Sequence, residues 1–508
     1  MSFDEQAATM TREDVAALLA SHDKLVQHLE WFKQQLFGSK SERRLLDPDG
    51  RQLALGEWGQ QEVPATEVTV GEHQRRTRPA RPEKADDELR FDESVPVEEI
   101  LLPAPGVDAD AEIVGEKVTM RLAQRPSSFV VLKFIRPVVK KKDGSLVCAP
   151  APTGVMGKSI ADVSLLASMA IDKFAYHLPL YRQHQRMQAA GVRLARSTLT
   201  NLIHRMADLL QPIYEAQLYS VVSGNVVAMD ETPIRAGRKR RGKMKTGYFW
   251  PIYGDRDEVV FPFSDSRSGG FIREQLGEFC GVLLTDGYPA YEKYAAQING
   301  VVHAQCWSHT RRHFLKAEDI EPELTAKALE QIRRLYEEED KISARQLDAS
   351  KRLELRGKHC KSIVDGFFEW LKTTLERNAL LPSSPFTAAA NYALAREEPL
   401  RVFLEYPDVP IDTNHLEREI RPIALGRKNW MFCWTEVGAH CVGIFQSLIS
   451  TCRLQGVDPY TYLVDVLQRI DDHPASDVVA LTPRLWKKRF LDDPRRSDID
   501  RVVNNVVP

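Results

Sequence analysis

Two short apolar runs that each end in an aspartate constrain the fold of this chain most strongly. The first run, Asn225–Met229, is followed by Asp230, and the second, Gly281–Thr285, is followed by Asp286. Each is typical of a buried strand that stops at a turn, because turn-forming residues follow directly. In open α/β sheets, functional sites lie outside the carboxyl ends of the strands. The pattern therefore predicts an α/β fold with two acids at one edge of a sheet.

A third acid, Glu417, lies in a segment rich in arginine. If residues 413–421 are helical, Asn414, Glu417 and Arg421 share one face of the helix. We expect this helix to stop at Pro422, because proline lacks an N–H donor and disfavours helix at the residue before it. A buried acid beside arginines is usually a structural ion pair, so this segment alone identifies no site.

Together, Asp230, Asp286 and Glu417 favour a metal site over three unrelated acids. Their oxygens are hard ligands, suited to Mg²⁺ or Mn²⁺ and poorly suited to zinc. Paired ions about 3.5–4 Å apart can activate water and stabilise the leaving oxygen in phosphoryl transfer. The alternative for each aspartate alone is a residue that caps a turn. We predict a site for two Mg²⁺ (or Mn²⁺) ions and expect no zinc.

Several motifs resemble those of the transposases of the insertion-sequence-66 family. These motifs are Met229–Pro233, Lys245–Trp250, Asp286–Tyr291, Cys306–Arg312, Asn414–Pro422 and Leu425–Asn429. The resemblance implies a DNA transposase with an RNase H-like mixed sheet and an Asp-Asp-Glu metal site formed by Asp230, Asp286 and Glu417. It also implies an insertion before the glutamate and small accessory proteins encoded alongside.

At 508 residues the chain is too long for one core, and we expect a multidomain α/β protein. The expected segments are a coiled-coil, leucine-zipper-like helix (1–44), a largely disordered linker (45–110), a β-rich remnant of a zinc-binding segment (111–155), a helical, helix-turn-helix-like DNA-binding domain (156–220), an RNase H-like catalytic domain (221–470) with a helical insertion at about 318–408, and a C-terminal tail (471–508).

The amino-terminal segment holds a heptad pattern. The positions that step by three and four are Val15, Leu18, His22, Leu25, Leu29, Phe32 and Leu36. This spacing predicts a coiled-coil seam and, with it, a homodimer or higher oligomer. The alternative is an amphipathic helix packed on the protein's own core.

Residues 115–150 alternate in the manner of strands. The resemblance implies a zinc-binding segment with cysteine pairs in this region, but Cys148 is the one cysteine present here. One thiol cannot supply a tetrahedral zinc site. We therefore expect a metal-free β-rich remnant whose lysines, Lys140–Lys142, still meet the DNA backbone.

Residues 157–210 have the pattern of helices. Ile160–Phe174 and Leu178–Ala190 are the first two, Gly191 makes a turn, and Ser197 is expected to cap a helix over Ser197–Leu210. The last pair has helix-turn-helix proportions, although a plain helical hairpin fits the spacing equally well. Its place before a transposase-like core favours DNA recognition. The residues expected to contact DNA are Arg196, Asn201 and Arg205.

The net charge of −2 gives no sign of nucleic-acid binding, so DNA contacts must come from local clusters. One cluster is Arg235–Lys245, expected as a cationic hairpin tip beside the metal site, with a solvated loop as the alternative. Near Trp430 and Trp434, cations and aromatic rings suit unpaired bases, although core packing fits the tryptophans as well. By these arguments and the resemblance, the further residues expected to contact DNA are Arg238, Lys239, Arg240, Arg241, Lys245, His309, Arg311, Arg312, Asn414, Arg421, Arg427 and Lys428.

These features predict a transposase that hydrolyses a phosphodiester at the element's end and then uses the freed 3′-hydroxyl to attack target DNA. The expected partners are double-stranded DNA (element ends and target), further copies of this chain and small accessory proteins. Two alternatives stay open: a structure-selective RNase H-like nuclease that does not join DNA, and a catalytically silent DNA-binding regulator.

The location follows from what the sequence lacks. Its seven cysteines include no C-x-x-C pair, no apolar run reaches membrane-spanning length, and Asp4 and Glu5 make the start too acidic for a signal peptide. We expect a cytoplasmic, nucleoid-associated protein with no membrane partner.

Overall fold

The structure is a computed structural model in which two units are distinguished, Met1–Glu83 and Lys84–Pro508. It describes residues 90–91, 95–103, 112–125, 128–142, 145–152, 154–157, 159, 161–240, 243–345, 347–377, 380–430, 433 and 435–505. The expected coiled coil (1–44) and most of the expected linker (45–110) lie outside these residues, so both stay predictions.

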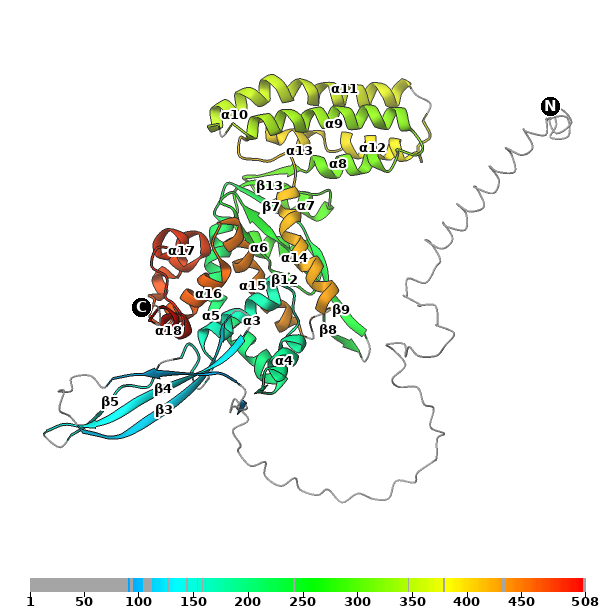
Figure 1. Ribbon diagram of the computed structural model, residues 1–508. Helices are drawn as coiled ribbons and strands as arrows, with labels where there is room; N and C mark the ends of the chain where they lie inside the picture. Colours follow the sequence, from blue (N-terminus) through cyan, green and yellow to red (C-terminus); the bar gives the residue numbers. More distant parts are fainter. Residues whose placement is uncertain are drawn as a thin grey trace, which may run out of the picture. The chain divides into compact units, whose positions relative to one another are not determined.

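A five-stranded mixed sheet forms the centre of the second unit (Figure 1). In spatial order its strands are β11 (Glu258–Val260), β10 (Ile252–Gly254), β7 (Val226–Met229), β13 (Gly281–Thr285) and β14 (Val301–Gln305). Strands β7, β13 and β14 run parallel, whereas β10 is antiparallel to both of its neighbours. The α/β character expected from the apolar runs is confirmed.

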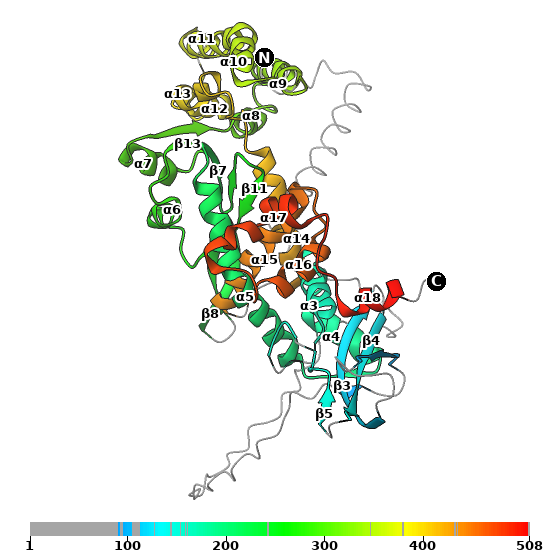
Figure 2. The ribbon, with the colours of Figure 1, turned by 90° about the vertical axis from the view of Figure 1, so that its left-hand side faces the viewer.

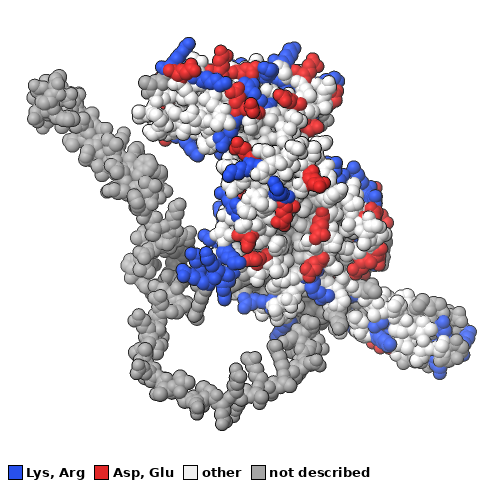
Figure 3. Space-filling model, turned by 180° about the vertical axis from the view of Figure 1, so that it is seen from behind, with Lys and Arg blue, Asp and Glu red and all other residues white. Residues whose placement is uncertain are grey.

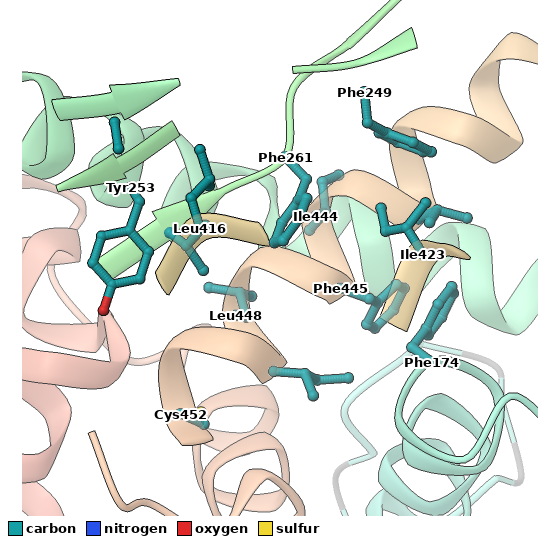
Figure 4. Packing of buried hydrophobic residues seen from close by; sticks show 14 of the residues in the cluster. Phe174, Phe249, Tyr253, Phe261, Leu416, Ile423, Ile444, Phe445, Leu448 and Cys452 are labelled. Atoms are coloured by element: carbon teal, nitrogen blue, oxygen red, sulfur yellow. The ribbon is translucent and has the colours of Figure 1, made fainter. Parts of the chain in front are cut away.

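Helices cover both faces of this sheet, which explains why β7 is a continuous apolar run. Val226 and Ala228 of β7 belong to one buried cluster, and Val227 and Met229 belong to another. The first cluster includes residues of α15 (Glu436–Leu454), which crosses the core in Figure 4. The second includes residues of α6 (Gly269–Leu276) and α7 (Pro289–Gln297).

A second, three-stranded sheet carries the cationic stretch. Its strands are β8 (Thr232–Arg240), β9 (Lys243–Phe249) and β12 (Phe263–Ser264), with β8 and β9 paired as a hairpin. The backbone of Cys433 fastens this hairpin, because its N–H donates to the carbonyl of Arg235 at 2.8 Å and its carbonyl accepts from Gly237 at 3.2 Å.

The strands expected over residues 115–150 are present. They are β3 (Glu112–Arg125), β4 (Ser128–Lys140) and β5 (Leu146–Cys148), and β2 (Val97–Leu101) also pairs with β4. Helix α18 (Asp498–Asn505) lies against β3 (Figure 2), and its Ile499 is buried with Leu132 and Phe134 of β4. A further two-residue strand, β1 (Arg90–Phe91), pairs with β6 (Val192–Arg193).

The helices expected before the central sheet are present, but the last of them has other limits than predicted. Helix α3 (Val163–Ala170) continues as a π-helical turn, Ile171–Ala175, and is followed by α4 (Leu180–Ala189) and α5 (Arg196–Val222). The expected cap at Ser197 is wrong, because α5 begins one residue earlier with no side-chain cap and runs on through Pro212. Buried side chains along its whole length keep it helical. The expected domain boundary at residue 220 thus falls inside α5, and the domain limits stay predictions.

The region expected as a helical insertion (about 318–408) is helical, with α8 before it. Its elements are α8 (Trp307–Leu315), α9 (Pro322–Ser343), α10 (Ala349–Leu355), a π-helical turn (Arg356–Cys360), α11 (Lys361–Arg377), α12 (Pro385–Leu394), α13 (Glu397–Arg401) and a 3₁₀ turn (Val402–Leu404). The indole N–H of Trp307 donates to the carbonyl of Leu400 at 2.9 Å, which joins α8 to α13.

Helix α14 (Asn414–Trp430) continues past Pro422, so the expected end at that residue is wrong. A proline inside a helix costs about 3 kcal/mol or more, because it removes one hydrogen bond and its ring meets the preceding turn. Leu416, Ile423 and Gly426 are buried on both sides of the proline, and their packing outweighs that cost.

The chain closes with α16 (Pro459–Arg469), a 3₁₀ segment (Ala475–Leu481), α17 (Pro483–Phe490) and α18. Among the helices of the described residues, none is long and apolar enough to cross a membrane.

Candidate active site and DNA-binding surface

Asp230 and Asp286 follow directly on two neighbouring parallel strands. Strands β7 and β13 pair in a register that sets Ala228 opposite Leu284. Continued two residues beyond this last pair, the same register would set Asp230 opposite Asp286. Neighbouring strands lie about 4.7–4.9 Å apart, so the backbones of the two aspartates are neighbours at one edge of the sheet.

The surroundings of Asp230 disfavour its charged form. Burial, and then the negative charge of Asp286, raise the pKa of Asp230 to about 7. The N–H of Glu231 donates to Oδ1 of Asp230 at 2.7 Å and lowers this pKa, whereas the negative charge of Glu417 raises it further. Gathered carboxylates with a raised pKa are typical of catalytic and cation-binding sites.

Glu417 lies in the first turn of α14, and the loop before it is bonded to the two residues that directly follow β14. The N–H of Trp307 donates to the carbonyl of Ile411 at 2.9 Å. The N–H and the hydroxyl of Thr413 both donate to Sγ of Cys306 at 3.3 Å. Because β13 and β14 are parallel neighbours, these bonds bring Glu417 to the same edge as the two aspartates.

The carboxylate of Glu417 is engaged by Arg312 of α8. Nη2 of Arg312 donates to both oxygens of Glu417, at 2.5 and 2.6 Å. His309 lies beside the pair, with Nε2 3.9 Å from Oε1 of Glu417 and 3.2 Å from Nη1 of Arg312. Burial and the charge of Arg312 lower the pKa of His309, so its ring is neutral near pH 7.

The three carboxylates have the chemistry of ligands for a hard divalent cation, but Glu417 is bonded to Arg312 and the three side chains are not arranged to hold an ion. Three carboxylates with no thiolate among them suit Mg²⁺ or Mn²⁺. A cation would also offset the repulsion that raises the pKa of Asp230. Among the described residues, no group of three or more His, Cys, Asp or Glu side chains is arranged to hold a metal ion. Arg312 and a cation would compete for the carboxylate of Glu417.

The cationic stretch forms the exposed end of the β8–β9 hairpin, where Lys and Arg gather in Figure 3. Arg238, Lys239 and Arg240 are exposed. Lys245 is half-buried and its Nζ lies 2.6 Å from Oε1 of Glu436. Arg241 lies outside the described residues. The hairpin therefore presents a local positive surface on a chain that is nearly neutral as a whole.

The residues expected to contact DNA on α5 lie in its first three turns. Arg196 and Asn201 are exposed, and the guanidinium of Arg196 lies 5.5 Å from the ring of Tyr181. Arg205 is exposed and donates to the carbonyl of Gly157 at 3.0 Å. The structure therefore places these side chains on the surface of one helix but does not bring them to the three acids.

The expected DNA contacts on α8 and α14 divide into exposed and engaged side chains. Arg311, Arg421 and Lys428 are exposed. Arg427 donates to the carbonyl of Pro233. Asn414 donates from its backbone N–H to Oδ1 of Asp412 at 3.0 Å and from its side chain to Oδ2, so it helps to begin α14.

The tryptophans expected near these cations show a packing role where they are described. Trp430 is half-buried, and Nζ of Lys173 lies 5.7 Å from its ring. A Cβ on Gly426 would lie 2.6 Å from the ring of Trp430, so the indole packs directly on its own helix. This contact favours the core-packing alternative for Trp430, whereas Trp434 lies outside the described residues.

Sequence reasoning missed a group of residues next to the two aspartates. Glu231, directly after Asp230, is buried and bonded to Arg267 and Tyr291. Glu231 and Tyr291 lie in the motifs after the two strands, which was the one available signal. Arg267 lies in a segment that no pattern distinguished.

Comparison with known proteins identifies the family of this chain. A model described as "Transposase IS66 family" matches residues 158–441, "IS66 C-terminal element" matches 447–484, and "Transposase C of IS166 homeodomain" matches 24–100. Two relatives, the uncharacterized proteins y4hP and y4qI, come from Sinorhizobium fredii (strain NBRC 101917 / NGR234). Protein y4hP is 31% identical over 496 residues, which cover 91% of this chain and 88% of that protein. Protein y4qI is 30% identical over 489 residues, which cover 91% and 89%. The chain belongs to the IS66 transposase family.

Proposed function

We propose that this chain cuts the ends of an insertion sequence and joins them to target DNA, using an RNase H-like core with Asp230, Asp286 and Glu417 as metal ligands. The observation that carries the proposal is the placement of Asp230 and Asp286 at matching ends of adjacent parallel strands. The negative charge of Glu417 lies near enough to raise the pKa of Asp230. Family membership supports DNA as the substrate.

In this proposal, each residue of the site has one task. Asp230, Asp286 and Glu417 would hold Mg²⁺ or Mn²⁺, which supplies charge stabilisation and activation of water when it is bound. Asp230 must lose its proton to serve as a ligand, which its pKa of about 7 allows near neutral pH. Glu417 must leave Arg312, whose guanidinium then becomes available to a DNA phosphate.

DNA is held by the cations around the site. The hairpin residues Arg238, Lys239 and Arg240 contact the phosphate backbone and orient the duplex without reading its sequence. The exposed polar residues at the start of α5 supply the base contacts. The phosphodiester cut at the element's end leaves a 3′-hydroxyl, which the same site directs at target DNA. Copies of the chain on paired ends act together.

The test of this proposal is the Asp230→Asn variant of the full chain. Cleavage of a duplex that carries the parent element's end should fall by at least about a hundredfold, because the variant loses a ligand charge. Binding of the same duplex, measured by fluorescence anisotropy, should be unchanged. Full cleavage by Asp230→Asn would contradict the proposal and favour a role in DNA binding alone.

A second assay separates joining from cutting alone. Pre-cut ends with a free 3′-hydroxyl are incubated with wild-type protein, Mg²⁺ and a supercoiled plasmid. The proposal predicts plasmid products covalently joined to the labelled ends, and none with Asp230→Asn. Cleavage of intact ends without any joined product would identify a nuclease instead.

A further inference from the structure

Glu231 is a buried carboxylate whose two oxygens both have donors. Its side chain is 4% exposed. Oε1 accepts from Nε of Arg267 at 2.9 Å and from Nη2 of the same guanidinium, and Oε2 accepts from the hydroxyl of Tyr291 at 2.9 Å. With its oxygens bonded in this way, Glu231 is a structural group rather than a fourth ligand of the acid site.

The same guanidinium contacts the loop that carries Asp286. Cζ of Arg267 lies 4.1 Å from the ring centroid of Tyr288, and the hydroxyl of Tyr288 donates to the backbone carbonyl of Arg267 at 3.1 Å. The N–H of Tyr288 donates to Oδ1 of Asp286 at 2.8 Å. Arg267 is therefore in direct contact with the residue that orients the carboxylate of Asp286.

The other end of the network reaches Asp230 in the same manner. The N–H of Glu231 donates to Oδ1 of Asp230 at 2.7 Å, so the residue bonded to Arg267 also orients this carboxylate. Each aspartate thus takes its orienting N–H from a residue that Arg267 touches: Glu231 for Asp230 and Tyr288 for Asp286.

We propose that Arg267 is a positioning residue for the metal site, holding the two aspartate loops at a fixed spacing through Glu231 and Tyr288 rather than through the aspartates themselves. The inference rests on the proposed function, because it assumes that the spacing of Asp230 and Asp286 matters for cation binding. Tyr291 of α7 completes the network by bonding the second oxygen of Glu231. Partners that orient metal ligands in this way typically change metal affinity by about 10–100-fold when they are replaced.

The test measures Mn²⁺ binding to the full chain by electron paramagnetic resonance, which counts free Mn²⁺ and needs no catalysis. Arg267→Gln should weaken Mn²⁺ affinity by about 10–100-fold. The Mn²⁺ affinity of Arg267→Lys should lie between those of Arg267→Gln and wild type, because lysine keeps a positive charge beside Glu231 but lacks the planar guanidinium group. Tyr291→Phe should give a smaller loss in the same direction. Affinity for a DNA duplex should not change.

Arg333→Gln on α9 is the matched control. Arg333 likewise bonds carboxylates, two oxygens of Glu330 and one of Glu337, and its side chain is 55% exposed against 45% for Arg267. It should bind Mn²⁺ as wild type does. Thermal unfolding of each variant shows whether it is folded, and Arg267→Lys and Tyr291→Phe carry the test if Arg267→Gln does not fold.

The outcomes separate this inference from the proposed function. If Asp230→Asn abolishes Mn²⁺ binding while the Arg267 and Tyr291 variants bind as wild type does, Arg267 has no positioning role and the proposed function stands. If wild-type protein shows neither Mn²⁺ binding nor cleavage, the proposed function fails and the inference falls with it. Graded weakening across the three variants, with Arg333→Gln unchanged, supports the inference.

Discussion

At the scale of single residues, Asp230 shows how a strand end prepares a carboxylate for a cation. The side chain is half-buried at the end of an entirely buried strand, next to the charge of Asp286. These surroundings favour the protonated acid, which costs binding energy when a cation must displace the proton. The same surroundings give a bound cation a strong field, because a site of low polarity screens its attraction to the carboxylates weakly.

This arrangement predicts a pH dependence of cation binding. Because the pKa of Asp230 is raised to about 7, the folded, cation-free protein carries a proton there below pH 7 and loses it above. A cation must displace this proton, so Mn²⁺ affinity should rise by about tenfold per pH unit below pH 7 and level off above it. Titration of the full chain with Mn²⁺ between about pH 5.5 and 8.5 measures this. A flat profile would contradict the electrostatic account of Asp230.

The strand-end acids were predictable from sequence, whereas their supporting contacts were not. Asp230 and Asp286 each follow an apolar run and precede a turn, and both signals are local. Arg267 reaches Glu231 across 36 positions, and Arg312 reaches Glu417 across 105. The sequence marked Arg312 as a DNA contact, but nothing local indicates that it bonds an acid of the site.

At the scale of elements, packing decides where helices end. Pro212 lies inside α5 and Pro422 inside α14, and both helices continue because buried side chains follow the proline. Helix existence, strand existence and the helical insertion were predictable from periodicity. The ends of α5 and α14 were not, because the rule for proline is local and the packing that overrides it joins distant segments.

The contact between α15 and the central sheet gives a test at this scale. A Cβ on Gly443 would lie 2.4 Å from the carbonyl oxygen of Phe261, so Gly443→Ala must push α15 away from the backbone after β11. We expect a loss of about 1–3 kcal/mol in the free energy of unfolding, measured with urea.

The control for this substitution is Gly366→Ala in α11. A Cβ there meets no atom within 4 Å, so alanine should raise stability by up to about 1 kcal/mol through its higher helix propensity. Equal effects of the two substitutions would show that α15 does not approach the backbone of Phe261 closely.

At the scale of the whole molecule, charge is local rather than global. The chain has a net charge of −2, yet the β8–β9 hairpin projects Arg238, Lys239 and Arg240 into solvent. The hairpin is bonded through Arg235 and Gly237 to Cys433, which follows α14, and α14 is the helix that carries Glu417. The family and the α/β architecture were predictable from the order of the motifs. The domain limits were not, because local sequence does not reveal that one helix, α5, spans the expected boundary at residue 220.

The hairpin predicts a salt dependence of DNA binding. Replacing Arg238, Lys239 and Arg240 by glutamine should reduce the slope of log K against log salt concentration by about 0.9 for each phosphate that the variant no longer neutralises. Affinities measured by anisotropy between about 50 and 200 mM KCl test this. The exposed Lys488 of α17 is the control, and its change to glutamine should leave the slope unaltered. A triple variant with the wild-type slope would place the DNA elsewhere.

The most direct measurement of the central claim is Mn²⁺ binding to the full chain in complex with a duplex of the element's end. Wild type is compared with Asp286→Asn, Glu417→Gln and the control Glu419→Gln. Glu419 lies two positions after Glu417 in α14, and its carboxyl group is hydrogen-bonded to Ser450. We predict that Asp286→Asn and Glu417→Gln each weaken Mn²⁺ affinity by at least about tenfold, and that Glu419→Gln binds as wild type does. Wild-type affinity in Glu417→Gln would contradict the account, because the helix acid would then not belong to the site of the two strand-end aspartates.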